Sequence, residues 1–155
     1  MNKVSSVLHS INVSAGGVPK LARRSAAVRV GGVEGDRQRD LRYHGGPTRA
    51  VSLYSLELIR ALQSEGNPID VGCIGENFTL EGVPWDRMVP GANLEVGEVQ
   101  LELTSYAAPC SNLVPYFAGG KFVRVAQKVH PGWSRLYARV LREGKAQVGD
   151  AVRLA

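Results

Sequence analysis

The sequence predicts a mostly β protein: an antiparallel, closed or nearly closed β-barrel with one to three short helices. Seven or eight segments alternate apolar and polar residues with the period of a strand, and one segment has the period of a helix. The strands follow one another without regular intervening helices, which argues against a parallel doubly wound sheet. Closure into a barrel removes the exposed edges of such a sheet.

Turns that contain glycine or proline separate the expected strands. Gly97-Glu98 has glycine at the first position of a two-residue turn, which predicts a hairpin whose strands contain Val96 and Val99. Further strands are expected over residues 3–13, 26–33, 50–54, 133–141 and 148–154.

One amphipathic helix is expected after the strand at residues 50–54. Ser55 is a good N-cap, Leu58, Ile59 and Leu62 form an apolar stripe, and Gly66 ends the helix. Two shorter helical segments are expected over residues 113–117 and 121–129.

The composition indicates a single globular domain over residues 1–155, long enough to bury a core without staples. No apolar run has the length of a signal peptide or a membrane-spanning helix, so a cytoplasmic protein without membrane contact is expected. The two cysteines do not make a disulfide framework and fit a reducing compartment.

The net charge of +5 is spread along the chain. There is no basic stripe with interleaved aromatic residues, so nucleic acid is not the expected partner. A small anionic ligand, such as a phosphate, is the preferred reason for the positive balance.

The segment 107–112 is the centre of the functional interpretation. It follows the strand that contains Val99, and Pro109 ends that strand. Ser111 and Asn112 are both good N-cap residues, so Cys110 is expected beside a helix N-terminus that favours its thiolate form. Such a thiol suits a metal ligand, a sulfur carrier or a nucleophile, although a lone cysteine is often a small core residue.

Two polar clusters accompany Cys110. In the first, consecutive glycines allow backbone N–H groups to approach an anion, and neighbouring side chains add donors. Its members are Asp36, His44, Gly45, Gly46 and Arg49. The second cluster is Gly75-Glu76-Asn77, in which one side chain orders the site and the other binds a ligand. A glycine-rich turn and local side-chain capping are the plainer interpretations of the two clusters.

The residues leave the chemistry of Cys110 open. Three histidines and two cysteines without paired metal spacing make a zinc site a poor fit. A cysteine hydrolase that pairs Cys110 with His44 or His130 is one alternative. A thiolate that ligates a metal brought in by a cofactor is the other.

In order and spacing, Gly35-Asp36, the His44 cluster, Gly75-Glu76-Asn77 and Pro109-Cys110 resemble the MOSC domain family, named for the C-terminal domain of molybdenum-cofactor sulfurases. The resemblance is greatest to small stand-alone bacterial members, of the YiiM kind. It covers nearly the whole chain.

The resemblance implies a β-rich fold and binding of the molybdenum cofactor, a pterin dithiolene that carries a phosphate. Pyridoxal phosphate binding is a label of the family only. By the same resemblance, Cys110 ligates molybdenum in the reduction of N-hydroxylated compounds or carries sulfur as a persulfide. Asn77, with Glu76 behind it, is implied to line the catalytic site. The implied cofactor contacts are His44, Gly45, Gly46, Arg49 and Asp36.

Some features depart from the family pattern. YiiM-type reductases carry a further helical C-terminal region, whereas this sequence stops at Ala155 and has no flavin or iron–sulfur motif. Ile74 stands where an aromatic residue is common, and Cys73 is interpreted as a core residue.

The implied partners are a small-molecule substrate and a separate electron or sulfur donor protein. Two other functions remain open at this point. One is a non-catalytic module that binds a pterin or another anion, and the other is a metal-free hydrolase or transferase that uses Cys110.

Overall fold

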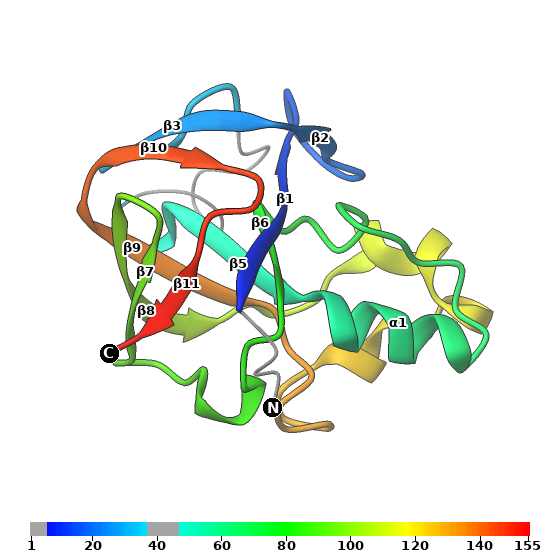
Figure 1. Ribbon diagram of the computed structural model, residues 1–155. Helices are drawn as coiled ribbons and strands as arrows, with labels where there is room; N and C mark the ends of the chain where they lie inside the picture. The colour runs from blue at the N-terminus through cyan, green and yellow to red at the C-terminus, as the bar shows by residue number, and fades with distance from the viewer. Residues whose placement is uncertain (1–5, 37–46) are drawn as a thin grey trace.

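The computed structural model describes residues 6–36 and 47–155. Its main element is an eight-stranded mixed sheet with the order β11-β7-β8-β9-β5-β6-β1-β2 (Figure 1). The mostly β prediction is therefore confirmed. In chain order, its strands are β1 (Val7–Val13), β2 (Leu21–Arg23), β5 (Val51–Ser55), β6 (Phe78–Glu81), β7 (Asn93–Val96), β8 (Val99–Tyr106), β9 (Leu136–Arg142) and β11 (Val152–Leu154).

The closed barrel is not confirmed, because the sheet has β11 at one edge and β2 at the other. An isolated antiparallel bridge joins Val7 of β1 to Ala151 beside β11. The amide of Leu8 also donates to the carbonyl of Asp150 at 2.9 Å. The sheet thus curls back toward itself without a continuous ladder between β11 and β1.

Pairing in this sheet is antiparallel except between β5 and β6, which run parallel. Parallel neighbours need a crossover connection, and here the connection contains helix α1 (Leu56–Ser64). The sequence pattern predicts no strand over residues 78–81. All of β6 except Glu81 is buried, and buried strands lose the alternation that marks a half-exposed one.

A second, three-stranded sheet has the order β10-β3-β4, with β3 (Ser25–Arg29), β4 (Gly32–Val33) and β10 (Gly144–Gln147). The strand predicted over residues 26–33 is divided into β3 and β4 by a turn at residues 30–31. The last predicted strand is shorter than expected, and β10 forms between the strands predicted over residues 133–141 and 148–154, where no strand is expected.

Helix α1 begins where the sequence predicts it. The N-cap residue is Ser55, and its hydroxyl oxygen accepts a hydrogen bond from the Leu58 amide at 3.2 Å. Leu56, Ile59 and Leu62 form the buried stripe. Within residues 6–36 and 47–155, no helix is long and apolar enough to cross a membrane.

The Ser55 cap gives a first prediction. Ser55→Ala removes the acceptor of an otherwise unpaired helix amide and should lower the free energy of unfolding by about 1 kcal/mol. Ser64→Ala is the matched control on the same helix. Its hydroxyl donates back to the Arg60 carbonyl at 3.1 Å and caps nothing, so we expect a change within about 0.5 kcal/mol. Urea unfolding of both variants measures the difference, and equal losses would contradict the cap.

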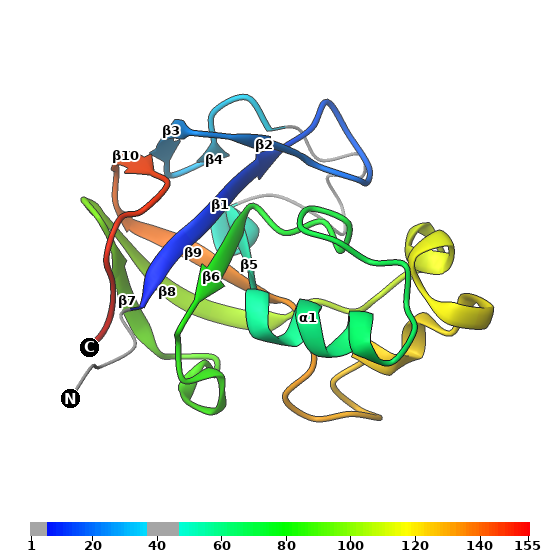
Figure 2. The same ribbon diagram turned by 45° about the vertical axis from the view of Figure 1, so that its right-hand side comes forward.

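A long connection, residues 107–135, joins β8 to β9 and carries three short 3-10 helices beside α1 (Figure 2). These are η3 (Ser111–Tyr116), η4 (Ala118–Gly120) and η5 (Phe122–Val125). The helical segments expected in this region are therefore 3-10 turns, and Pro115 lies inside the first. Two further 3-10 turns, η1 (Pro47–Arg49) and η2 (Trp85–Arg87), lie elsewhere.

The buried apolar residues form two clusters. The larger cluster joins residues of the main sheet, such as Leu8, Leu53 and Phe78, to residues of the three-stranded sheet. The smaller joins α1 to the 107–135 connection, where Ile59 and Leu62 pack with residues such as Leu113, Phe117 and Val125. The second cluster therefore fixes the connection against the rest of the domain.

Candidate functional site

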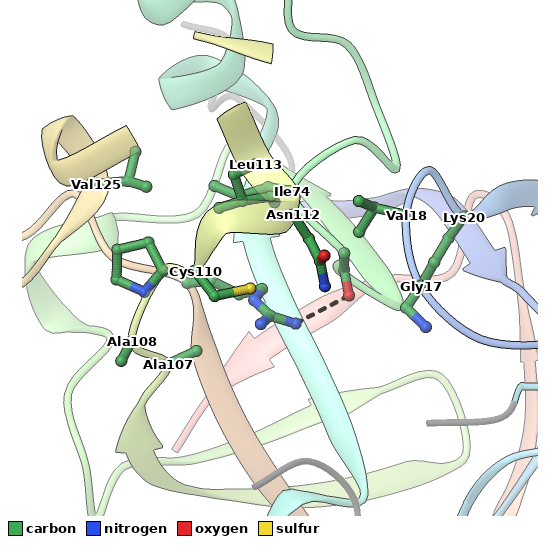
Figure 3. A pocket seen from close by; sticks show the side chains of 13 residues that line it. Gly17, Val18, Lys20, Ile74, Ala107, Ala108, Cys110, Asn112, Leu113 and Val125 are labelled. Atoms are coloured by element: carbon green, nitrogen blue, oxygen red, sulfur yellow. Dashed lines mark hydrogen bonds between the residues drawn. The ribbon is translucent and has the colours of Figure 1, made fainter. Parts of the chain in front are cut away.

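A pocket lies where three segments meet: the loop between β1 and β2, the turn at residues 72–75, and the start of the 107–135 connection. Figure 3 shows Cys110 and Asn112 on one side of it and Val18 and Lys20 on the other. Ile74, Leu113 and Val125 give it an apolar wall. The pocket thus combines a thiol, polar groups and apolar surface, which is typical of small-molecule sites.

Cys110 is half-buried and lines this pocket. Cys110 is itself the residue that caps η3, and its carbonyl accepts a hydrogen bond from the Leu113 amide at 3.0 Å. The expected cap by a Ser111 or Asn112 side chain is wrong, because no side chain caps this turn. The thiol is held by the backbone turn and faces the pocket.

Lys20 is a pocket residue that the sequence interpretation missed as a functional side chain. Its ammonium nitrogen lies 2.7 Å from Oδ1 of Asp36, and both side chains are about 5% exposed. Asp36 Oδ1 also accepts a hydrogen bond from the Ser14 amide at 2.9 Å. These contacts fix the β1–β2 loop and hold Lys20 at the edge of the pocket.

Asn77 lies behind the pocket and does not line it. Its side-chain amide donates to Asp36 Oδ2 at 2.9 Å and to the Asn12 carbonyl at 3.2 Å. Its side-chain oxygen accepts a hydrogen bond from the Ser52 amide at 3.0 Å. Asn77 therefore joins β1, β5 and β6 to Asp36, which follows β4, as a buried and fully bonded side chain.

Glu76 is completely buried beside Asn77. Its Oε2 accepts from the Gly72 amide at 3.1 Å and from the Thr79 hydroxyl at 2.8 Å. Its Oε1 is buried and has no hydrogen-bond partner among the residues that the structure describes. Burial raises the pKa of this carboxyl, because the charged form loses its hydration.

Arg135 is the second cation of the pocket that sequence reasoning missed. Its Nη1 donates to the Gly75 carbonyl at 3.0 Å, and its guanidinium lies 5.1 Å from the centre of the Tyr137 ring. The guanidinium of Arg49 lies 5.5 Å from the same ring. Tyr137 therefore has both guanidinium groups near its ring, and of the two arginines only Arg135 lines the pocket.

A family model for the MOSC domain matches residues 40–153. The chain belongs to the MOSC domain family. The match includes Cys110, the Gly75-Glu76-Asn77 segment and Arg135.

Two curated proteins are similar in sequence to this MOSC domain. The uncharacterized protein YflK of Bacillus subtilis is 30% identical over 78% of this chain and 54% of its own length. Protein YiiM of Escherichia coli is 27% identical over 79% of this chain and 56% of its own. The chain thus spans about half the length of these curated relatives.

A solved structure, YiiM from Geobacillus stearothermophilus, has the same fold. Its TM-score is 0.73 at 24% identity, over 97% of this chain and 75% of that chain. The predicted resemblance to the MOSC family and its small YiiM-like members is therefore confirmed.

The MOSC domain brings the predicted site residues together in two layers. Cys110 lines the pocket, whereas Glu76, Asn77 and Asp36 form the polar layer behind it. Arg49 does not line the pocket, and its guanidinium lies near the same Tyr137 ring as that of Arg135. His44, Gly45 and Gly46 lie outside the described residues. No local sequence pattern marks Arg135 as a site residue, because its position depends on β9 pairing with β5. Lys20 follows the glycine-rich turn at residues 16–19, and this turn could have pointed to it.

The other predicted participants lie elsewhere. His130 is on the same connection as Cys110 but does not line the pocket. Cys73 is buried in the smaller apolar cluster, so its interpretation as a core residue is confirmed. Burial raises the pKa of the Cys73 thiol. In the described ranges, no three His, Cys, Asp or Glu side chains come together as a metal site.

Proposed function

We propose that this MOSC domain binds the molybdenum cofactor in the Cys110 pocket and uses it to reduce N-hydroxylated compounds. The observation that carries the proposal is the joint presence of a half-buried thiol and two cations, Lys20 and Arg135, on the walls of one pocket. A thiolate is a soft metal ligand, and lysine and arginine bind phosphate. A metallated pterin with a phosphate group presents both complementary chemistries.

The shape of the wall also fits a bound group. Gly75 lines the pocket at a φ of 89°, and a Cβ there would stand 3.3 Å from Nη1 of Arg135 and 3.2 Å from Cγ1 of Val18. A side chain would therefore press on Arg135 and narrow the pocket. Glycine keeps this wall open and lets the Gly75 carbonyl hold the guanidinium in place.

In this proposal, Cys110 supplies the metal ligand, and Lys20 and Arg135 bind the phosphate or other acidic oxygens. Arg49, Asp36, His44, Gly45 and Gly46 remain the candidate supporting contacts, with Asn77 and Glu76 behind them. The cofactor, when bound, supplies a redox-active metal.

The net reaction breaks the N–O bond of the substrate. It consumes two electrons and two protons, and it gives an amine-type product and water. The electrons come from a separate donor protein. Nothing in the described pocket favours pyridoxal phosphate over this assignment.

The second candidate function for Cys110 is that of a persulfide carrier. The observation that favours it is that the half-buried Cys110 thiol lines a pocket. In that case the Cys110 thiolate attacks the outer sulfur of a persulfide on a donor protein, the donor thiolate leaves, and attack by a nucleophilic acceptor on the same outer sulfur later frees the Cys110 thiolate. The two candidates differ in what purified Cys110 carries.

The test compares Cys110→Ala with Cys73→Ala, the same change at the buried cysteine. Both proteins and the wild type are purified from a molybdenum-replete host, and molybdenum, pterin and intact mass are measured. We expect the wild type and Cys73→Ala to retain molybdenum and pterin, and Cys110→Ala to retain roughly tenfold less molybdenum or lower.

Equal molybdenum in wild type and Cys110→Ala would overturn the ligand role and leave a binding module for the pterin. A wild type without molybdenum or pterin, but with one added sulfur atom that Cys110→Ala lacks, would favour the persulfide carrier instead. Circular dichroism spectra of the variants check that each has folded.

A further inference from the structure

The connection that carries Cys110 has an unusual charge pattern. Residues 103–142 contain six lysines and arginines and no aspartate or glutamate, although the chain has 14 acidic residues. Most of the arginines in this stretch are engaged: Arg124 with Glu65, Arg135 with Gly75, and Arg139 with Glu102. Lys121 and Lys128 are exposed and form no ion pair with the described part of the chain. Lys121 and Lys128 therefore present positive charge to solvent from this connection.

Exposed apolar side chains lie on the same connection. Val114, Val123 and Val129 are 44%, 47% and 54% exposed, three of the eight large apolar residues that stand out in the described residues. We call Val114, Lys121, Val123, Lys128 and Val129 the rim surface. Protein–protein interfaces combine an apolar core with a polar, solvent-accessible rim, and these residues offer both kinds of contact.

The rim surface is firmly held and adjoins the pocket. Arg124 on η5 forms two hydrogen bonds with Glu65 at the end of α1, at 2.7 and 2.9 Å, and stacks on Trp133. Asn67 accepts from the Ala118 amide at 3.0 Å. Leu113 and Val125 of the same connection line the Cys110 pocket. In Figures 1 and 2 this connection projects beside α1, at the far end of the molecule from β10. Connections of this length in compact domains usually carry function.

We infer that the rim surface docks an acidic electron-donor protein beside the Cys110 pocket. This inference rests on the proposed function, which needs two electrons for each substrate molecule. Charge complementarity selects the partner: two free lysines attract an acidic surface and speed its encounter, and the valines supply apolar contact area. A second copy of this chain carries the same positive charge and is repelled. Among the aromatic residues of the connection, Phe117 is buried and Tyr116, Phe122 and Trp133 are part-buried, which leaves poor stacking surfaces for nucleic-acid bases.

The test uses three acidic one-electron carriers as probes: a plant-type ferredoxin, a flavodoxin and a soluble b-type cytochrome. Binding is measured by titration calorimetry at several salt concentrations, with the wild type, Lys121→Glu/Lys128→Glu and Lys145→Glu. Lys145 is an exposed lysine on β10 and is the matched control. We expect salt-sensitive binding of at least one carrier, weakened about tenfold by the double change and within about twofold of wild type in the control.

A parallel assay supplies electrons from reduced methyl viologen, which needs no docking surface. Turnover with viologen should be equal in all three proteins. No viologen turnover by any of them would count against the proposed function, while a lysine-dependent affinity for the carrier would still support the surface. Normal viologen turnover without binding of any carrier would overturn the inference that the rim surface docks a donor. Carrier binding that is unchanged in Lys121→Glu/Lys128→Glu would overturn it as well. Tighter, lysine-dependent binding of duplex DNA or anionic vesicles than of the carriers would replace the protein partner with that polyanion.

Discussion

Gly72→Ala is expected to lower the free energy of unfolding by about 3 kcal/mol or more, because it combines backbone strain with an overlap against main chain. Gly72 has a φ of 85°, and a Cβ built there would overlap the carbonyl oxygen of Lys20. The same two residues are joined by a hydrogen bond from the Lys20 amide to the Gly72 carbonyl at 3.0 Å. The overlap involves backbone on both sides, so rotation of a side chain cannot relieve it.

Gly66→Ala is the control for the strain alone. Gly66 has a φ of 97°, but a Cβ there would meet nothing within 4 Å. Its replacement should cost about 1 kcal/mol, from the left-handed backbone conformation. Urea unfolding of both variants separates the cost of the backbone strain from the cost of the overlap with Lys20. If Gly72→Ala loses no more stability than Gly66→Ala, the close approach of Gly72 to Lys20 is wrong.

The Gly72 contact also has a functional consequence. It places the β1–β2 loop against the turn at residues 72–75, and these two segments supply Lys20 and Gly75 to the pocket. A Gly72→Ala protein that still folds should therefore retain less cofactor than Gly66→Ala. This expectation depends on the proposed function, whereas the stability difference does not.

Local features of the fold could be predicted from the sequence, because local chemistry decides them. Ser55 caps α1 through its own hydroxyl, and Gly97-Glu98 permits a tight turn between β7 and β8. The strands that were missed depend on distant partners. β10 buries only Ala146 and owes its strand form to pairing with β3, so its own residues carry no alternation. The β5–β6 pairing likewise exists only after α1 has crossed over.

The site divides in the same way. Cys110 and the Gly75-Glu76-Asn77 segment could be singled out from the sequence, because their order and spacing resemble those of a known family. Arg135 does not stand out, since its role depends on the Gly75 carbonyl 60 residues away. No local pattern shows that the Asn77 side chain belongs to a buried polar layer, because this depends on its hydrogen bond to Asp36, 41 residues away.

Glu76→Gln is expected to remove a pH dependence of stability that the wild type shows. The unfolded chain releases the Glu76 proton near pH 4.3, whereas burial raises the pKa of this carboxyl in the folded state. Between these two pKa values the folded protein binds more protons than the unfolded one. The stability that Glu76 contributes is thus fully present below the unfolded pKa and is lost as pH rises through the folded pKa, with a slope of up to about 1.4 kcal/mol per pH unit.

Glutamine preserves the local contacts while removing the titration. Its side-chain oxygen can still accept from the Gly72 amide and the Thr79 hydroxyl, as Oε2 of Glu76 does. The charge of Arg135 favours the carboxylate form of Glu76. Tyr54 and Cys73 are the ionisable groups that Glu76 acts on, and burial raises the pKa of both. The measured quantity is the difference in unfolding free energy between Glu76→Gln and wild type, which should increase with pH from about 4.3 upward.

Thr79→Val tests whether the carboxyl itself is responsible. The Thr79 hydroxyl donates to Oε2 and lowers the pKa of Glu76, so its removal should extend the falling part of the stability curve to higher pH. That extension must disappear in the double variant with Glu76→Gln, because no titrating group remains there. If Thr79→Val shifts the curve equally in both backgrounds, or if wild type and Glu76→Gln run parallel with pH, then Glu76 does not hold a proton in the folded protein. A neutral Glu76 would instead mean that this position adds no negative charge to the layer behind the pocket, where the Asp36 carboxylate already pairs with Lys20.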